Sequence, residues 1–323
     1  MGKGVRYVYL IVLCGLLLLS SCSKKKADVV RFGICTDVHL PTMHDSEYRI
    51  TTFIDSMKKS QPDFIIELGD FGIPKPEYAP YFDIWNSFEG EKYHVIGNHE
   101  MDGGTSREAA LAYRNMESGY YAFNKNGFHF IVLDGNDKSS PEAKGYKQFI
   151  GPDQIDWLKN DLEKVEHPVI IFSHQGLNLY HGAKEDYGVE NYREVQQILE
   201  NHNTECPESK VIACFNGHSH WDVADEVNGI YYITVTSMSY HWLGDEYKHV
   251  RYSEAIDKNF KWIKYTAPFK EPLFATVEIS TDGYIKISGK QSGWVGPSPW
   301  ELGFPERLKK YIRPAISDRY LKF

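Results

Sequence analysis

The chain has 323 residues, of which 42% are hydrophobic and 25% charged, a balance typical of a globular protein that can bury a sizeable core. Its net charge is −8, and no stripe of Lys and Arg occurs beyond Lys24-Lys25-Lys26, which is more simply a solvated tether. This charge pattern argues against a nucleic-acid-binding protein, and we expect no nucleic acid as a partner.

The amino terminus has the pattern of an export signal. Lys3 and Arg6 precede an apolar run over residues 8–19, which is typical of a secretory signal peptide and too short to span a membrane comfortably. Removal of residues 1–21 would take the net charge from −8 to −10. An uncleaved anchor and a plain secretory signal are the alternatives.

The residues that end this run, Leu19-Ser20-Ser21-Cys22, resemble a bacterial lipobox, in which the chain is cut before the cysteine. The resemblance implies that Cys22 carries the lipid and that residues 22–30 form a lipidated tether. We therefore expect a protein that is exported and anchored to a bacterial membrane. Ser23, in place of the Asp that favours inner-membrane retention, favours the outer membrane, on its periplasmic or surface side.

Five short apolar segments predict buried strands, because they are rich in Val, Ile and Phe. They are residues 29–35, 64–68, 93–96, 169–172 and 211–215. Each is followed by polar residues, in order Asp37-Val38-His39, Gly69-Asp70, Gly97-Asn98-His99-Glu100, Ser173-His174 and Gly217-His218-Ser219-His220. In an open α/β sheet the loops at the carboxyl ends of the strands line one crevice, so these residues are expected to converge.

The spacing of the remaining apolar residues predicts further elements in chain order. Helices are expected over residues 46–59, 81–88 (after a break at three prolines), 106–116, 154–165 and 192–199. A hairpin pairs residues 119–123 with 128–133, and a later antiparallel meander is expected from residues 230–236, 274–279 and 284–288. The Pro- and aromatic-rich carboxyl-terminal stretch is expected to be an ordered covering segment.

Other polar residues are weaker candidates. The segment Asp134–Asp137 ends a predicted strand near the crevice; Asn136 in it could touch substrate, although a plain turn is the simpler interpretation. His241 follows a core strand and could line a substrate cleft. Cys35 and Cys214 lie in apolar runs and are expected in the core, whereas Cys206 lies in a polar loop.

Taken together, the five motifs resemble the signature of the calcineurin-like metallophosphoesterases, over residues 31–222. The resemblance implies an α/β fold, a four-layer α/β/β/α sandwich of two mixed sheets with flanking helices. Residues 31–272 would form the catalytic domain, and residues 273–323 would add strands and a covering tail to it.

The resemblance also implies roles for individual residues. Two divalent ions (Mn²⁺, Fe²⁺/Fe³⁺ or Zn²⁺) are expected, because the matched ligands are carboxylate, imidazole and amide groups. Asp37, His39 and His220 would hold one ion, Asn98, His174 and His218 the other, and Asp70 would bridge both. His99 would donate a proton to the leaving group or stabilise the charge of the transition state, with Glu100 as a candidate orienting partner, while a hydroxide between the metals attacks phosphorus.

Two departures from the motifs of related families narrow the branch of metallophosphoesterases that the chain resembles. Protein Ser/Thr phosphatases carry the motif GDxVDRG. The corresponding segment here begins with Gly69-Asp70-Phe71 but lacks the second Asp and the Arg of that motif. Purple acid phosphatases use a metal-binding Tyr where Phe71 stands. The remaining resemblance is to the bacterial branch of cyclic-nucleotide phosphodiesterases and general phosphohydrolases.

The expected function is therefore a lipid-anchored hydrolase that cleaves phosphodiester or phosphomonoester bonds in a small phosphorylated substrate. The alternatives are a pyrophosphatase acting on nucleotide conjugates and a non-catalytic surface lipoprotein that binds a phosphorylated ligand.

Overall fold

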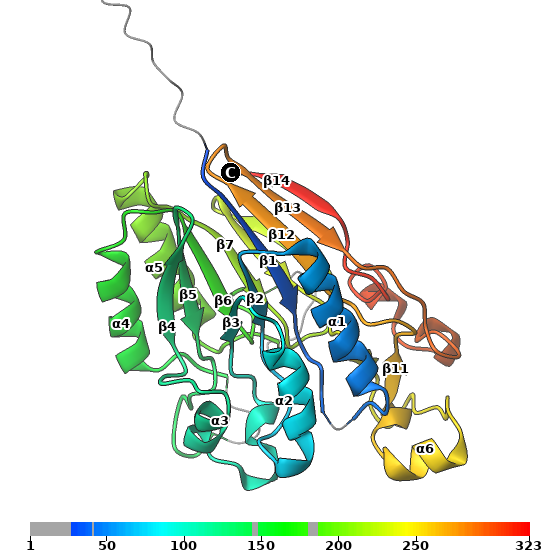
Figure 1. Ribbon diagram of the computed structural model, residues 1–323. Helices are drawn as coiled ribbons and strands as arrows, with labels where there is room; N and C mark the ends of the chain where they lie inside the picture. Colours follow the sequence, from blue (N-terminus) through cyan, green and yellow to red (C-terminus); the bar gives the residue numbers. More distant parts are fainter. Residues whose placement is uncertain (1–26, 41, 144–147, 180–186) are drawn as a thin grey trace, which may run out of the picture.

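Two six-stranded sheets pack face to face and carry helices on their outer faces, as the computed structural model shows (Figure 1). The structure describes residues 27–40, 42–143, 148–179 and 187–323. The predicted signal peptide and Cys22 lie outside the described residues. The predicted α/β sandwich with two mixed sheets is confirmed.

The first sheet combines strands from both ends of the chain. Its order is β14-β13-β12-β1-β2-β3. β1 pairs in parallel with β2 and antiparallel with β12, so the carboxyl-terminal strands extend the sheet that opens the chain. The bounds are β1 (Val29–Cys35), β2 (Phe64–Glu67), β3 (Glu91–His94), β12 (Ala275–Ser280), β13 (Tyr284–Gly289) and β14 (Arg319–Lys322).

The second sheet has the order β4-β5-β6-β7-β9-β8, with a parallel centre and antiparallel edges. The predicted hairpin is confirmed: β4 and β5 turn at Asn126 and Gly127, whose φ angles of 46° and 78° suit a tight hairpin turn. The bounds are β4 (Tyr121–Lys125), β5 (Phe128–Leu133), β6 (Val169–Ser173), β7 (Val211–Asn216), β8 (Val223–Val227) and β9 (Ile230–Thr234).

The predicted meander is wrong in one respect, because β9 pairs with β7 and β8 in the second sheet, whereas β12 and β13 lie in the first. The chain crosses between the sheets through a two-stranded ribbon, β10 (Tyr240–Trp242) with β11 (Thr266–Pro268). Strand β8 was not predicted, since only its first residue is buried and its apolar pattern is weak.

Helices α1 (Ser46–Ser60) and α2 (Ala79–Asn86) pack on the first sheet, and α4 (Pro152–Leu162) and α5 (Tyr192–Glu205) on the second (Figure 1). The shorter helices are α3 (Arg107–Tyr113) and α6 (Glu254–Asn259). Helix α2 begins two residues before its predicted start because Pro80 occupies its first turn, where a missing N–H is tolerated. Helix α5 runs six residues past its predicted end and buries His202, which bonds to the Ser209 carbonyl.

Phenylalanines fill the space between the two sheets. Phe32 of β1 stacks on Phe64 at 4.9 Å and meets the edges of Phe130, Phe172 and Phe215 from the other sheet. This apolar layer fixes the two sheets against each other and so fixes the relative positions of the loops at their carboxyl ends.

The carboxyl-terminal stretch packs against the loop that follows β7. Trp221 stacks on Tyr311 at 4.9 Å. Asp222 is buried and accepts hydrogen bonds from the backbone of Ser317 at 3.2 Å, and it pairs with Arg319 at 2.7 Å. The tail thereby clamps the segment that carries His218 and His220.

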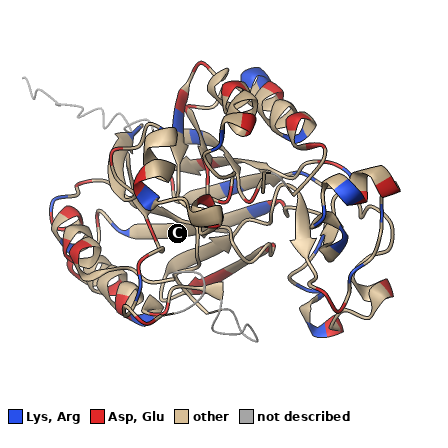
Figure 2. Cartoon of the chain, turned by 90° about the horizontal axis from the view of Figure 1, so that it is seen from below, with Lys and Arg blue, Asp and Glu red and all other residues tan. Residues whose placement is uncertain are grey.

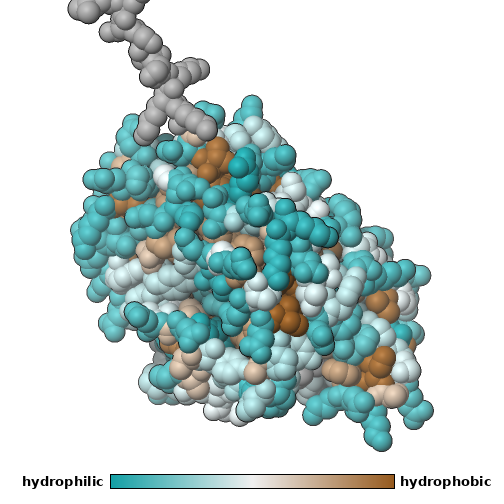
Figure 3. All heavy atoms as spheres, in the orientation of Figure 1, coloured by the Kyte–Doolittle hydropathy of each residue, from teal (hydrophilic) through white to brown (hydrophobic). Residues whose placement is uncertain are grey.

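The surface in this orientation is mostly hydrophilic (Figure 3), and acidic and basic residues are interspersed around the loops seen from below (Figure 2). Cys35 and Cys214 are buried as predicted, Cys206 is half-buried, and all three are free thiols. None of the helices in the described ranges is long and apolar enough to span a bilayer.

Candidate metal centre

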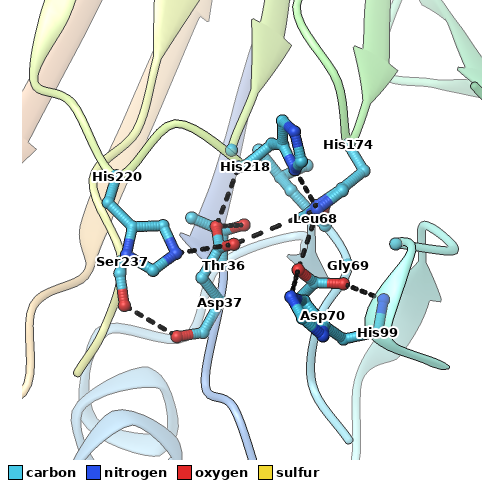
Figure 4. Close-up of polar contacts among 12 residues, drawn as sticks. Thr36, Asp37, Leu68, Gly69, Asp70, His99, His174, His218, His220 and Ser237 are labelled. Atoms are coloured by element: carbon cyan, nitrogen blue, oxygen red, sulfur yellow. Dashed lines mark hydrogen bonds and ion pairs between the residues drawn. The ribbon is translucent and has the colours of Figure 1, made fainter. Parts of the chain in front are cut away.

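The polar residues that follow β1, β2, β6 and β7 converge at one edge of the two sheets (Figure 4). Asp37 and His39 come from β1, Asp70 from β2, His174 from β6, and His218 and His220 from β7. Three overlapping groups have ligand atoms within 4.8 Å of one another: Asp37 with His39 and His220; His39 with Asp70 and His99; and Asp70 with His174 and His218.

The first group places two imidazoles and a carboxylate around one point. His39 Nε2 and His220 Nε2 lie 2.9 Å apart, and Asp37 Oδ1 lies 3.1 Å from His220 Nε2 and 3.5 Å from His39 Nε2. Ligand atoms about 2.1 Å from one octahedral ion lie about 3 Å apart. The spacing therefore fits a divalent cation held by these three side chains.

The second group has a fixed histidine tautomer. His174 Nδ1 donates to the carbonyl of Leu68 at 2.7 Å, so Nε2 is left to face Asp70 Oδ2 at 3.1 Å and His218 Nδ1 at 3.2 Å. Such an outer hydrogen bond is typical of metal-binding histidines. Burial opposes the charged form, but the carboxylates of Asp70 and Asp37 outweigh it and raise the pKa of His174 to about 10.

The same environment has the opposite effect on the pKa of His218. Its burial, with the charge on His174 beside it, lowers the pKa of His218 to about 3. The neighbouring imidazoles hold the pKa of Asp70 below its ordinary value against the effect of burial. The two carboxylates of Asp37 and Asp70 are buried in this cluster, and a cation would balance their negative charge.

Asn98 gives a further test of whether the residues present fit a metal ion. The residue is 3% exposed, and neither its Oδ1 nor its Nδ2 has a hydrogen-bond partner among the described residues. An unpaired buried amide oxygen costs about 1–3 kcal/mol, and a hard cation would satisfy it. The residues present therefore fit a metal ion.

Five of these residues have strained backbone conformations. All have positive φ angles, namely Asp37 (52°), His39 (57°), Asp70 (55°), His218 (65°) and His220 (54°). The left-handed region costs a non-glycine residue roughly 1–2 kcal/mol, and such strain gathers at functional sites. Thus the fold accepts strain at the residues whose side chains converge.

The comparisons with known proteins agree with this geometry. Residues 30–222 match the model of the calcineurin-like phosphoesterases, which covers more than half of the chain. The chain belongs to the calcineurin-like phosphoesterase family. It is therefore a metal-dependent phosphoesterase, a hydrolase whose family uses divalent metal ions.

Individual relatives of this phosphoesterase are distant. Purple acid phosphatase 15 of Arabidopsis thaliana is 27% identical over 164 residues, in an alignment that covers 38% of this chain and 29% of the plant protein. The chain thus spans less than a third of that protein's length.

Two solved structures share the fold. A dimetal phosphatase from Danio rerio has a TM-score of 0.55 at 15% identity, covering 84% of this chain and all of that one. GAP50, the anchor in the inner membrane complex of Plasmodium, has a TM-score of 0.54 at 16% identity, covering 83% and 85%.

Glu100 of this phosphoesterase has a different place from the predicted one. It is buried, and its carboxylate accepts hydrogen bonds from the backbone N–H groups of Gly97 (2.7 Å), Asp70 (2.9 Å) and Gly72 (3.1 Å). Arg114 Nη2 lies 2.9 Å from it, and burial raises the pKa of Glu100 to about 7. Glu100 therefore ties two ligand-bearing loops together instead of orienting His99.

The partner of His99 is Asp102, which the sequence reasoning missed. Asp102 Oδ2 lies 2.7 Å from His99 Nδ1, and His99 Nε2 lies 3.9 Å from Asp70 Oδ2. The spacing of three residues within a short helical turn was the available signal. Burial opposes protonation, yet Asp70 and Asp102 raise the pKa of His99 to about 9.

The two weaker candidates are placed at the margins of the centre. Asn136 is buried, its amide bonds to the Ile96 carbonyl (2.8 Å), Asp134 (2.7 Å) and Gln175 (2.9 Å), and it also lines a cavity beside Asn98. His241 lies with its ring centre 6.3 Å from that of His220, and burial lowers the pKa of His241 to about 3.

Two aromatic residues support the centre from the protein side. Phe71 is fully buried and packs on Phe82 at 4.8 Å, so the position after Asp70 contributes to the core. Tyr240, which the sequence reasoning did not single out, stacks on His39 at 5.0 Å and meets His220 at 5.3 Å. Its ring restrains two candidate ligand imidazoles.

Proposed function

We propose that this phosphoesterase is a binuclear enzyme that hydrolyses phosphodiester or phosphomonoester bonds in a small phosphorylated substrate. The observation that carries the proposal is that Asp70 belongs to two of the three ligand groups, and His39 joins the third to them. Asp37, His39 and His220 would hold one ion; Asn98, His174 and His218 would hold the other; Asp70 would lie between the two.

The donor set favours Mn²⁺, Fe²⁺/Fe³⁺ or Zn²⁺, because it contains carboxylate, imidazole and amide groups and no thiolate. When bound, two such ions neutralise charge on phosphoryl oxygens and provide a nucleophile at neutral pH. The chain itself orients the ligands: the Leu68 carbonyl fixes His174, and Glu100 holds the loops of Asp70 and Asn98 together.

His99 is the proposed proton donor to the leaving group. Its side chain is 36% exposed and therefore accessible to substrate, whereas the proposed ligands Asp37, His39, Asp70, Asn98, His174 and His220 are buried. Asp102 accepts from Nδ1 and so leaves Nε2 to face the reacting group. Asp102 thus acts as a positioning residue for His99.

Turnover by the metal-loaded protein tests this proposal. Protein loaded with Mn²⁺ is expected to hydrolyse p-nitrophenyl phosphate or bis-p-nitrophenyl phosphate, and elemental analysis is expected to find about two ions per chain. One ion per chain would contradict the binuclear centre. Faster cleavage of a nucleotide diphosphate conjugate would favour a pyrophosphatase, and tight binding of these compounds without turnover would favour a non-catalytic ligand-binding protein.

Replacement of His99 separates proton transfer from metal binding. His99→Asn is expected to lower kcat by about 10²-fold, because a general acid contributes about that much, while the metal content stays unchanged. Asp102→Asn is expected to lower kcat by about tenfold, as supporting residues of a site do. His249→Asn, at an exposed histidine, is the matched control. Loss of bound metal in His99→Asn would instead make His99 a ligand.

A further inference from the structure

A cavity of about 500 Å³ opens beside the candidate metal centre, between the segment that follows β3 and the loop that follows β5. Two of its lining residues connect it to the reaction. Asn98 is a proposed ligand, and Asp102 holds His99. A substrate whose phosphoryl group lies at the metal centre would therefore direct its leaving group past His99 into this cavity.

The polar lining of the cavity is mixed and nearly balanced in charge. Asp102, Glu108 and Asp137 contribute carboxylates, and Arg107 and Lys138 contribute cations. The Arg107 guanidinium is held in place, with Nη1 2.8 Å from Asp137 Oδ1 and Nη2 3.0 Å from Asp134 Oδ2. The cavity therefore presents rigid donors and acceptors side by side, without a strong net field.

This lining excludes several classes of leaving group. A second anionic group would meet three carboxylates against two cations, and a cationic group would find Asp102 and Asp137 already paired with His99 and Arg107. None of the described lining residues is aromatic, so a nucleobase would find no ring there on which to stack. Met101 is the one large apolar residue among the described lining residues, too little for an acyl chain.

We propose that this cavity binds a neutral, hydroxyl-rich leaving group, a polyol or a sugar, and so makes such phosphate esters the preferred substrates. Each hydroxyl both donates and accepts, which matches the alternation of carboxylates with Arg107 and Lys138. Thr105 and Ser106 add hydroxyls of their own to the lining. This assignment rests on the proposed hydrolase function and specifies the substrate class of the same site.

Two matched pairs of esters test the proposal. Myo-inositol 1-phosphate and cyclohexyl phosphate share a six-membered carbon ring, and glycerol 3-phosphate and n-propyl phosphate share a three-carbon chain; within each pair only the hydroxyls differ. The metal-loaded protein is expected to show at least about tenfold higher kcat/KM for the hydroxylated member, because a site built to bond hydroxyls discriminates against analogues that lack them. Equal or faster cleavage of the plain esters would overturn the proposal.

Variants of the cavity localise the effect. Lys138→Gln, at an exposed residue that does not support the fold, and Arg107→Gln are each expected to reduce the ratio of kcat/KM between inositol and cyclohexyl phosphates by at least about threefold. Arg193→Gln, on the outer helix α5, is the control and is expected to leave this ratio unchanged. An unchanged ratio in Lys138→Gln and Arg107→Gln would overturn the assignment of this cavity.

Binding of the free alcohol separates this inference from the hydrolase proposal. In saturation-transfer NMR, myo-inositol is expected to receive signal from the protein and cyclohexanol is not, whether or not the protein turns over esters. Binding of inositol without hydrolysis of any ester would uphold the cavity and contradict the hydrolase. Hydrolysis of p-nitrophenyl phosphate without inositol binding or hydroxyl preference would uphold the hydrolase and contradict the proposed role of the cavity.

Discussion

Asp70→Asn is expected to abolish phosphoester hydrolysis, with a loss of at least about 10³-fold in kcat/KM. Asp70 Oδ2 lies 3.1 Å from His174 Nε2, and Asp70 Oδ1 accepts from the backbone N–H of His99 at 2.8 Å. It is the carboxylate shared by two ligand groups. Asparagine keeps the size and removes the charge, so the two cations proposed above would lose their common counter-charge.

Steady-state rates and metal content of the purified variant check this expectation together. Fewer than two ions per chain are expected in Asp70→Asn after loading and desalting, along with the lost rate. Asp156→Asn is the matched control, because the Asp156 side chain is 77% exposed on helix α4, away from the centre. A variant that kept both ions and more than a tenth of the wild-type rate would contradict the bridging role.

Glu100→Ala is expected to lower the free energy of unfolding by about 3–5 kcal/mol, the usual cost of breaking a buried ion pair from one side. The change leaves Arg114 with a buried guanidinium that has lost its closest carboxylate. It also leaves the backbone N–H groups of Gly97, Asp70 and Gly72 without their acceptor. Because these groups belong to two ligand-bearing loops, metal affinity is expected to fall as well.

Denaturant unfolding of the metal-free protein measures the stability part of this effect. Glu163→Ala, an exposed acid at the end of helix α4, is expected to change stability by less than about 0.5 kcal/mol. Glu100→Gln, which retains one acceptor oxygen, is expected to lie between the two. A loss below about 1 kcal/mol in Glu100→Ala would show that the two loops are held by other contacts.

The sequence was sufficient to predict the strands that form the parallel centre of both sheets. Short runs such as residues 211–215 are apolar throughout, which is typical of a strand that is buried on both faces. The polar residues directly after such strands could therefore be assigned to one edge of the sheets. The periodic spacing of α1 and α4 was equally informative, since each buries one face.

Other features depend on contacts between distant parts of the chain. The pairing of β9 with β7 and β8 is decided by the sheet that it joins, which a local apolar run does not reveal. Glu100 acquires its partners because residues 70, 72 and 97 approach it in the folded chain. An acidic residue next to a histidine in sequence was therefore given the wrong partner, while Asp102, one turn onward, holds the imidazole.

The direction of β1 has a consequence for access. The strand begins beside the carboxyl terminus and runs toward the middle of the molecule (Figure 1), and Asp37 follows its last residue by two positions. Its seven residues cover about 20 Å. The candidate metal centre therefore lies about one strand length from Val29, and a substrate reaches it from the end of β1 that is away from Val29.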